Sequence, residues 1–190
     1  MRRRARLRAA ALPSSFAGMP HALFPTQFGT CGIGWNENGL TGFQLPDDND
    51  ALTERSLAAR AGTQPGEPPE WVRQIIARVQ LHLAGKLQDF SGTPLDRSYA
   101  SDFQMAVYVQ TQAVKPGFKK SYGEIARLMA LGNESARAVG AALAANPWPL
   151  IVPCHRVVSA GDKMTGFSAP GGVRTKTRLL ALEGAELLSD

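Results

Sequence analysis

The chain has 190 residues, of which 44% are hydrophobic and 19% are charged, the composition of an ordinary globular protein. No stretch approaches the roughly 20 consecutive apolar residues of a membrane-spanning helix, so we expect a soluble protein with no membrane partner. The length suits one large domain or two small ones, and we expect two. The two cysteines, Cys31 and Cys154, are too few for a disulfide framework and favour a reducing compartment, the cytoplasm.

The net charge of +5 is distributed unevenly. Residues 1–8 hold five arginines and no acid, residues 9–114 hold six basic and ten acidic groups, and residues 115–190 hold ten basic and six acidic groups. A basic C-terminal part suggests an anionic partner such as nucleic acid, although a solvated surface explains an excess of this size equally well. Residues 1–20 are expected to form a disordered Arg-rich arm, for which an over-long start or a targeting piece is favoured over a functional role.

Residues 22–45 alternate short apolar stretches with glycines, and Asn38-Gly39 is typical of a β-hairpin. This pattern predicts a small antiparallel sheet in which Cys31 is a half-buried structural residue. Residues 46–69 contain "DDND" and "GTQPGEPP", which predict a loop that separates two elements.

Apolar residues at helical spacing next predict a helix over residues 70–86 that packs on the sheet. His82 lies on this helix and is expected to be partly exposed, with no role as a metal ligand. Residues 88–96 predict a strand or a linker that runs to a domain boundary near residue 95.

The second half contains three expected helix starts, at Ser101 with Gln104, at Ser121 with Glu124, and at Asn133. The last two begin helices that flank a Gly-containing turn, which is helix-turn-helix spacing, although helical hairpins without DNA share it. The second of these helices is mostly alanine and glycine around one long cation, Arg137. Close packing inside the protein explains small residues, whereas a single Arg on a bare helix favours insertion into a duplex.

Cys154 lies directly before His155 and after Pro153, which interrupts an apolar run. A free thiol is only a few per cent ionised at neutral pH unless a base or a positive field assists it. Pro153 must bend the chain, so that the neighbouring thiol and imidazole can cooperate. Glu183 in the final amphipathic helix is the acid that we expect to orient the imidazole.

The stretch Pro153-Cys154-His155-Arg156-Val157-Val158 resembles the active-site signature of the O6-alkylguanine-DNA alkyltransferases, the methylated-DNA–protein-cysteine S-methyltransferases. The chain also contains "SYGEIA", "ESARAVGAALAANPWPLIVPCHRVV", "GFSAPGG" and "RLLALEGA" in that family's order, so the resemblance is dense over residues 95–186 and loose before them. It implies an α+β fold. A small N-terminal α/β domain with an antiparallel, ribonuclease-H-like sheet would span residues 21–95, and a helical domain with a helix-turn-helix would span residues 96–190.

The resemblance also implies roles for individual residues. Cys154 would accept the alkyl group irreversibly in a single turnover, with no cofactor, while His155 takes its proton through a water and Glu183 holds the imidazole. Tyr122 would rotate the damaged nucleotide out of the stack and donate to its base, and Arg137 would enter the space left behind. The slim helix that carries Ser135, Ala136 and Ala138 would lie in the minor groove of double-stranded DNA, bound by a monomer.

The implied alkylguanine pocket is lined by Pro149, Val157, Phe167 and Ser168, and Asn146 would tie the recognition helix to the turn that bears the thiol. No metal site is expected, because His21, Cys31 and His82 form no compact ligand set in the sequence. Three other functions stay open: a lesion-binding protein without transfer, a sequence-reading DNA regulator, and a thiol hydrolase with the same Cys-His-Glu logic.

Overall fold

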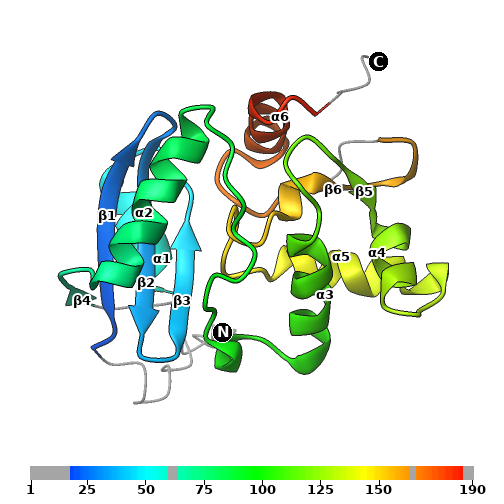
Figure 1. Cartoon of the computed structure of the whole chain (residues 1–190), viewed down its shortest axis with the longest axis horizontal. Helices are drawn as coiled ribbons and strands as arrows, with labels where there is room; N and C mark the ends of the chain where they lie inside the picture. The colour runs from blue at the N-terminus through cyan, green and yellow to red at the C-terminus, as the bar shows by residue number, and fades with distance from the viewer. Residues whose placement is uncertain (1–17, 60–63, 163–165, 186–190) are drawn as a thin grey trace, which may run out of the picture.

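The computed structural model describes residues 18–59, 64–162 and 166–185 (Figure 1). The arm predicted over residues 1–20 therefore lies almost entirely outside the described residues. The remainder has a mixed α+β architecture, with a sheet and two helices in the N-terminal half and mainly helices in the C-terminal half. None of the described helices is long and apolar enough to cross a membrane.

The N-terminal sheet has the strand order β3-β2-β1-β4. β1 (Pro20–Thr26), β2 (Gly29–Asn36) and β3 (Gly39–Gln44) form an antiparallel meander, as predicted, and the short β4 (Gln64–Pro65) adds a parallel edge to β1. The predicted hairpin is present, but Asn36 pairs with Gly39, so Glu37 and Asn38 form the turn and Gly39 begins β3. Gly39 has a positive φ of 142° and touches the backbone of residues 94–95, which leaves no room for a side chain.

Two helices cover opposite faces of this sheet. α2 (Glu70–Leu83) forms where the sequence predicts a helix and packs its apolar stripe on one face. α1 (Asp50–Ala58) packs on the other face, where Leu57 lies against Gly32. The prediction of a loop over residues 46–69 is wrong for α1, because the acidic run "DDND" supplies a helix cap: the Asn49 side chain accepts from the backbone N–H of Leu52.

Residues 84–101 connect the two halves without a regular strand, so the linker alternative of the prediction holds. Leu95 forms one isolated bridge with Leu40, and a short 3₁₀ turn follows at Arg97–Tyr99. Asp96 starts this turn by accepting from Ser98 and is also bound by the Asn36 amide at 2.6 Å. The hydrogen bond from Asn36, the last residue of β2, therefore joins the connecting segment to the sheet.

The C-terminal half contains α3 (Asp102–Gln112), α4 (Tyr122–Leu128), α5 (Ala136–Ala144) and α6 (Gly172–Leu182). Between them lie a parallel pair of two-residue strands, β5 (Lys120–Ser121) and β6 (Val157–Val158), and 3₁₀ turns at Asn133–Ser135, Cys154–Arg156 and Ala160–Asp162. The two capping boxes predicted from the sequence are confirmed at Ser101 and Ser121. Asn133 does not cap α5; its side chain accepts from Arg127 instead.

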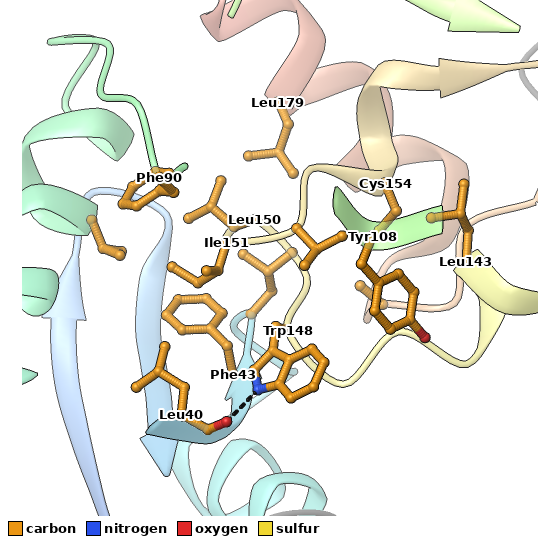
Figure 2. Packing of buried hydrophobic residues seen from close by; sticks show 14 of the residues in the cluster. Leu40, Phe43, Phe90, Tyr108, Leu143, Trp148, Leu150, Ile151, Cys154 and Leu179 are labelled. Carbon is orange, nitrogen blue, oxygen red and sulfur yellow. Dashed lines mark hydrogen bonds between the residues drawn. The ribbon is translucent and has the colours of Figure 1, made fainter. Parts of the chain in front are cut away.

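The two halves share one continuous apolar core (Figure 2). Trp148 is fully buried between them and donates its indole N–H to the carbonyl oxygen of Leu40 at 2.8 Å. The backbone N–H of Phe43 donates to Pro147 O at 2.8 Å. Two residues of β3, Leu40 and Phe43, therefore form hydrogen bonds with the segment that precedes Cys154. Because a buried donor left unpaired is costly, these two bonds fix the position of that segment.

Candidate active site

Residues 146–156 form the segment that positions Cys154. Asn146 organises it: its side-chain oxygen accepts from Trp148 N at 2.9 Å, and its amide nitrogen donates to Val152 O at 3.0 Å. Pro153 has φ −79° and ψ 63°, and Cys154 N donates to Val152 O at 2.8 Å across it, which is an inverse γ-turn. The proline therefore ends the apolar run and starts the 3₁₀ turn that carries Cys154 and His155.

Cys154 is 7% exposed, and that small exposed part lines a pocket of about 340 Å³. Burial raises the pKa of the Cys154 thiol, while the hydrogen bond from Asn146 and the positive charge of Lys176 act in the opposite direction. The Asn146 amide nitrogen lies 3.3 Å from Sγ. At rest the sulfur is accordingly a protonated thiol, and a proton acceptor is needed before it can act as a nucleophile.

His155 and Glu183 form the buried pair that the sequence predicts. His155 Nε2 lies 3.0 Å from Glu183 Oε1, and both side chains are fully buried. Glu183 is the C-cap residue of α6. Burial by itself would raise the pKa of Glu183, but hydrogen bonds from His155, His82 and Arg156 outweigh it and hold this pKa far below its usual range.

Because Glu183 is ionised, it can only accept, and His155 must donate from Nε2. That tautomer leaves Nδ1 of His155 without a proton, and no group of the described residues forms a hydrogen bond with this buried atom. Burial lowers the pKa of His155 despite the nearby carboxylate. The imidazole is therefore neutral at physiological pH, with one nitrogen available to accept a proton.

Three residues of this network were not assigned to it from the sequence. Arg156 forms a bidentate ion pair with Glu183: Nε donates to Oε2 at 2.9 Å, and one terminal nitrogen donates to Oε1 at 2.8 Å. His82, expected to be partly exposed, is fully buried and lies 3.0 Å from Glu183 Oε1. That expectation is wrong because α2 turns this face towards α6 rather than towards solvent.

Lys176 is the third unassigned residue, and it is 0% exposed. Its ammonium donates to Val157 O at 2.6 Å and lies 6.0 Å from the centre of the Tyr122 ring. Burial lowers the pKa of Lys176, and a charge on Cys154 would raise it. The signal in the sequence was its spacing: Lys176 precedes Leu179 and Leu180 by three and four residues, which places it on the apolar face of the last helix.

The pocket beside the thiol contains only some of the expected lining. Tyr122, Phe167 and Ser168 line it together with Cys154, and α5 contributes Gly140, Leu143 and Ala144. Pro149 and Val157 are buried and are not among its lining residues, and Val157 contributes a carbonyl oxygen to Lys176 instead. A Cβ placed on Gly140 would lie 3.8 Å from the Tyr122 ring, an ordinary van der Waals distance, so α4 and α5 approach each other at this side of the pocket.

A second and wider concavity of about 720 Å³ opens next to the first and shares Tyr122, Gly140 and Gly166 with it. Its lining also includes Ala136 and Arg137 of α5, and Ser121 and Arg127 from the region of α4. Arg137 and Ala138 are exposed on α5, and Ser135 and Ala136 are half-buried at its start. Of the expected DNA-contacting residues, Tyr122, Ala136 and Arg137 therefore line the concavity next to the thiol pocket, whereas Ser135 and Ala138 line neither.

The candidate metal ligands lie apart. His21 pairs with Glu54 at 3.0 Å, His82 pairs with Glu183, and Cys31 is buried in β2. In the part of the chain that the structure describes, no three such side chains are placed to hold a metal ion.

Comparison with known proteins identifies the family. Residues 102–185 match the sequence model of the 6-O-methylguanine DNA methyltransferase, DNA binding domain. The methylated-DNA–protein-cysteine methyltransferase of Mycolicibacterium paratuberculosis is 39% identical over 117 residues, which are 62% of this chain and 68% of that protein. The chain belongs to this methyltransferase family. The corresponding protein of Methanothermobacter thermautotrophicus is 29% identical over 82% of this chain and 80% of its own length.

Members of the methyltransferase family also share the fold. The crystal structure of Mycobacterium tuberculosis OGT in complex with DNA superposes with a TM-score of 0.69 at 29% identity, covering 87% of this chain and 92% of that chain. The similarity therefore includes the N-terminal sheet as well as the helical half, and the mixed α+β fold expected from the sequence is confirmed.

Proposed function

We propose that this protein repairs DNA by transferring an alkyl group, methyl in the simplest case, from O6 of guanine to Sγ of its own Cys154. The observation that carries the proposal is the position of Cys154, which lines a pocket together with residues of α5, while the adjacent His155 is buried in a hydrogen bond with Glu183. A relative named methylated-DNA–protein-cysteine methyltransferase and an OGT structure in complex with DNA support it.

In the proposed reaction His155 Nδ1 takes the thiol proton through a water molecule. The thiolate then attacks the alkyl carbon, so that a C–S bond forms while the bond from that carbon to O6 breaks, and guanine leaves with a proton returned to its ring. The product is a thioether, which has no easy route back to the thiol. Each protein molecule therefore acts once, as a methylated-DNA–protein-cysteine S-methyltransferase that is consumed, and needs no cofactor.

Because Cys154 is only 7% exposed and lines a pocket, we expect that the guanine must leave the duplex to reach it. We infer that α4 and α5 act as a helix-turn-helix whose second, slim helix enters the minor groove with Ser135, Ala136 and Ala138 against the backbone. Arg137 would fill the space in the stack, and Tyr122, at the border of both concavities, would help rotate the nucleotide and donate to its base. Flipping costs a few kcal/mol and least for a mispaired base, which selects damaged sites.

In this proposal Asn146 holds Sγ of Cys154 through its amide, and Phe167 and Ser168 face the base in the pocket. Pro149 and Val157 would act indirectly, by shaping the wall behind the pocket. We expect a monomer, and two free thiols suit a reducing compartment such as the cytoplasm.

The test is a transfer assay with a duplex that carries one O6-methylguanine with a labelled methyl group. We expect one label per protein molecule, recovered in the peptide that contains Cys154. Label on another residue, or several methyl groups removed per protein molecule, would refute the proposal, and turnover of thioesters without DNA would favour the hydrolase alternative.

A further inference from the structure

His82 reaches the active site from the other half of the molecule. It lies in the last turn of α2, 101 residues before Glu183, yet its Nε2 is 3.0 Å from Glu183 Oε1. Its ring is tilted at 58° against the ring of Phe90, with 5.4 Å between centroids, and is fully buried. Figure 1 shows the C-terminal end of α2 at the same end of the molecule as α6, whose last turn leads into Glu183.

The backbone determines which nitrogen of His82 carries the proton. Gln88 N–H donates to His82 Nδ1 at 3.0 Å, so that this nitrogen must be the unprotonated acceptor. The proton of the neutral ring is therefore on Nε2 and points at Glu183. The loop that follows α2 thereby sets His82 as a donor to the carboxylate.

We propose that His82 is a positioning residue for alkyl transfer: by donating to Oε1 of Glu183, it holds the carboxylate in the orientation that keeps His155 in its reactive tautomer. Oε1 accepts from His82 and His155 at 3.0 Å each and from Arg156 at 2.8 Å, whereas Oε2 accepts from Arg156 Nε as its one hydrogen-bond donor among the described residues. Without His82, Oε1 loses the only donor that comes from the N-terminal half among the described residues. This inference rests on the proposed function.

A purely structural role for His82 makes a different prediction. The residue would then contribute to stability, and its loss would lower the melting temperature without changing the rate constant of the folded protein. A positioning role lowers the rate constant of transfer at saturating DNA, because the proton acceptor is less often in the productive geometry.

The experiment compares three variants of the full chain in single-turnover transfer from methylated duplex, with rates corrected for the active fraction. His82→Phe keeps an aromatic ring against Phe90 but removes the donor, and His82→Gln restores an N–H that can reach Glu183. Val79→Ala is the matched control, since Val79 is fully buried on the same helix and is not part of the site.

We expect the rate constant to fall roughly tenfold in His82→Phe, as for the loss of one hydrogen bond to a charged group, and to recover most of this loss in His82→Gln. Val79→Ala should lower the melting temperature and leave the rate constant unchanged. A wild-type rate constant in His82→Phe, or one in His82→Gln that is as low as in His82→Phe, would overturn the proposal.

A measurement on the unmodified chain keeps the proposal testable if the variants do not fold. The chain has three histidines, so ¹⁵N spectra of the labelled imidazoles can be assigned with a His21→Gln variant and the effect of methylation of Cys154. We expect both His82 and His155 to carry their proton on Nε2. A proton on Nδ1 of His82 would overturn the proposal, whereas failure of the wild-type protein to take up methyl would refute the proposed function instead.

Discussion

The two cysteines of this chain are both buried free thiols, yet they lie in different surroundings. Cys31 is fully buried in β2, and burial raises its pKa to about 12 against the effect of a hydrogen bond with Thr26. Cys154 is buried almost as deeply, but part of its surface lines a pocket, and Asn146 and Lys176 counteract the effect of burial on its pKa. Because burial is similar, we expect access to the pocket and the neighbouring polar groups to decide which of the two thiols reacts.

Exchanging each sulfur for oxygen gives the largest expected contrast. Cys154→Ser should reduce methyl transfer from O6-methylguanine DNA by more than about a thousandfold, because a hydroxyl is a far weaker nucleophile than a thiol. Cys31→Ser should transfer at the wild-type rate after correction for the folded fraction. Single-turnover assays with labelled duplex measure both, and a loss of transfer in Cys31→Ser alone would contradict this assignment of the two thiols.

The charge network behind Cys154 has no counterpart near Cys31 among the described residues. Glu183→Gln should slow transfer by roughly a hundredfold, since His155 would lose the carboxylate that fixes its tautomer. It should also cost about 3 kcal/mol of stability, because Arg156 stays buried without its partner. Asp89→Asn is the control: it breaks the exposed pair with Lys115 and should change both quantities little.

The effect of Glu183→Gln on the free energy of unfolding should depend on pH. The folded-state pKa of Glu183 lies below its unfolded value of about 4.3, so its ionised form stabilises the fold above that pH and this stabilisation is lost as the pH falls towards the folded-state pKa. Below about pH 5 the free energy of unfolding should fall more steeply with decreasing pH in the wild type than in Glu183→Gln. Equal slopes in urea titrations across this range would contradict the ion pair.

The hydrogen-bond partners of the two sulfurs allow a finer comparison. Asn146→Ala removes the amide that contacts both Cys154 Sγ and Val152 O, and we expect transfer to slow by roughly tenfold. Thr26→Val removes the hydroxyl that lies 3.9 Å from Cys31 Sγ and also binds Phe28 N, so it should lower stability by about 1 kcal/mol without slowing transfer. Equal rate effects of the two substitutions would show that the contact to Sγ has no special role.

The smallest expected effect concerns the ammonium near the reactive thiol. Lys176→Met removes a charge that lowers the pKa of Cys154, so alkylation of Cys154 by iodoacetamide, measured in a Cys31→Ser background, should slow by roughly threefold to tenfold at neutral pH. The pH at which the rate rises should move upward. Arg174→Met, on the exposed face of the same helix, should leave this profile unchanged.

Local signals predicted much of the fold. The apolar stripe of α2 and the capping boxes at Ser101 and Ser121 depend on residues within one or two helical turns, and all three are found where expected. α1 was missed because its cap, Asn49, lies in a run of acids that equally favours a loop, and it has only a weak apolar face. The hairpin turn lies at residues 37–38, one residue before the Asn38-Gly39 pair that predicted it. Gly39 belongs to β3 and packs against the backbone of residues 94–95, a contact that a local signal does not reveal.

The sequence by itself determined the reactive groups of the candidate site: a thiol next to Pro153, which bends the chain, an imidazole beside that thiol, and a carboxylate at the end of the last helix. These follow from residue types and from the local geometry of proline. Only the tertiary structure decided which partners complete the site. His82, Arg156 and Lys176 meet Glu183 and Cys154 because separate elements pack around one core, and the depth of burial that fixes tautomers and shifts pKa values arises only when these elements close together.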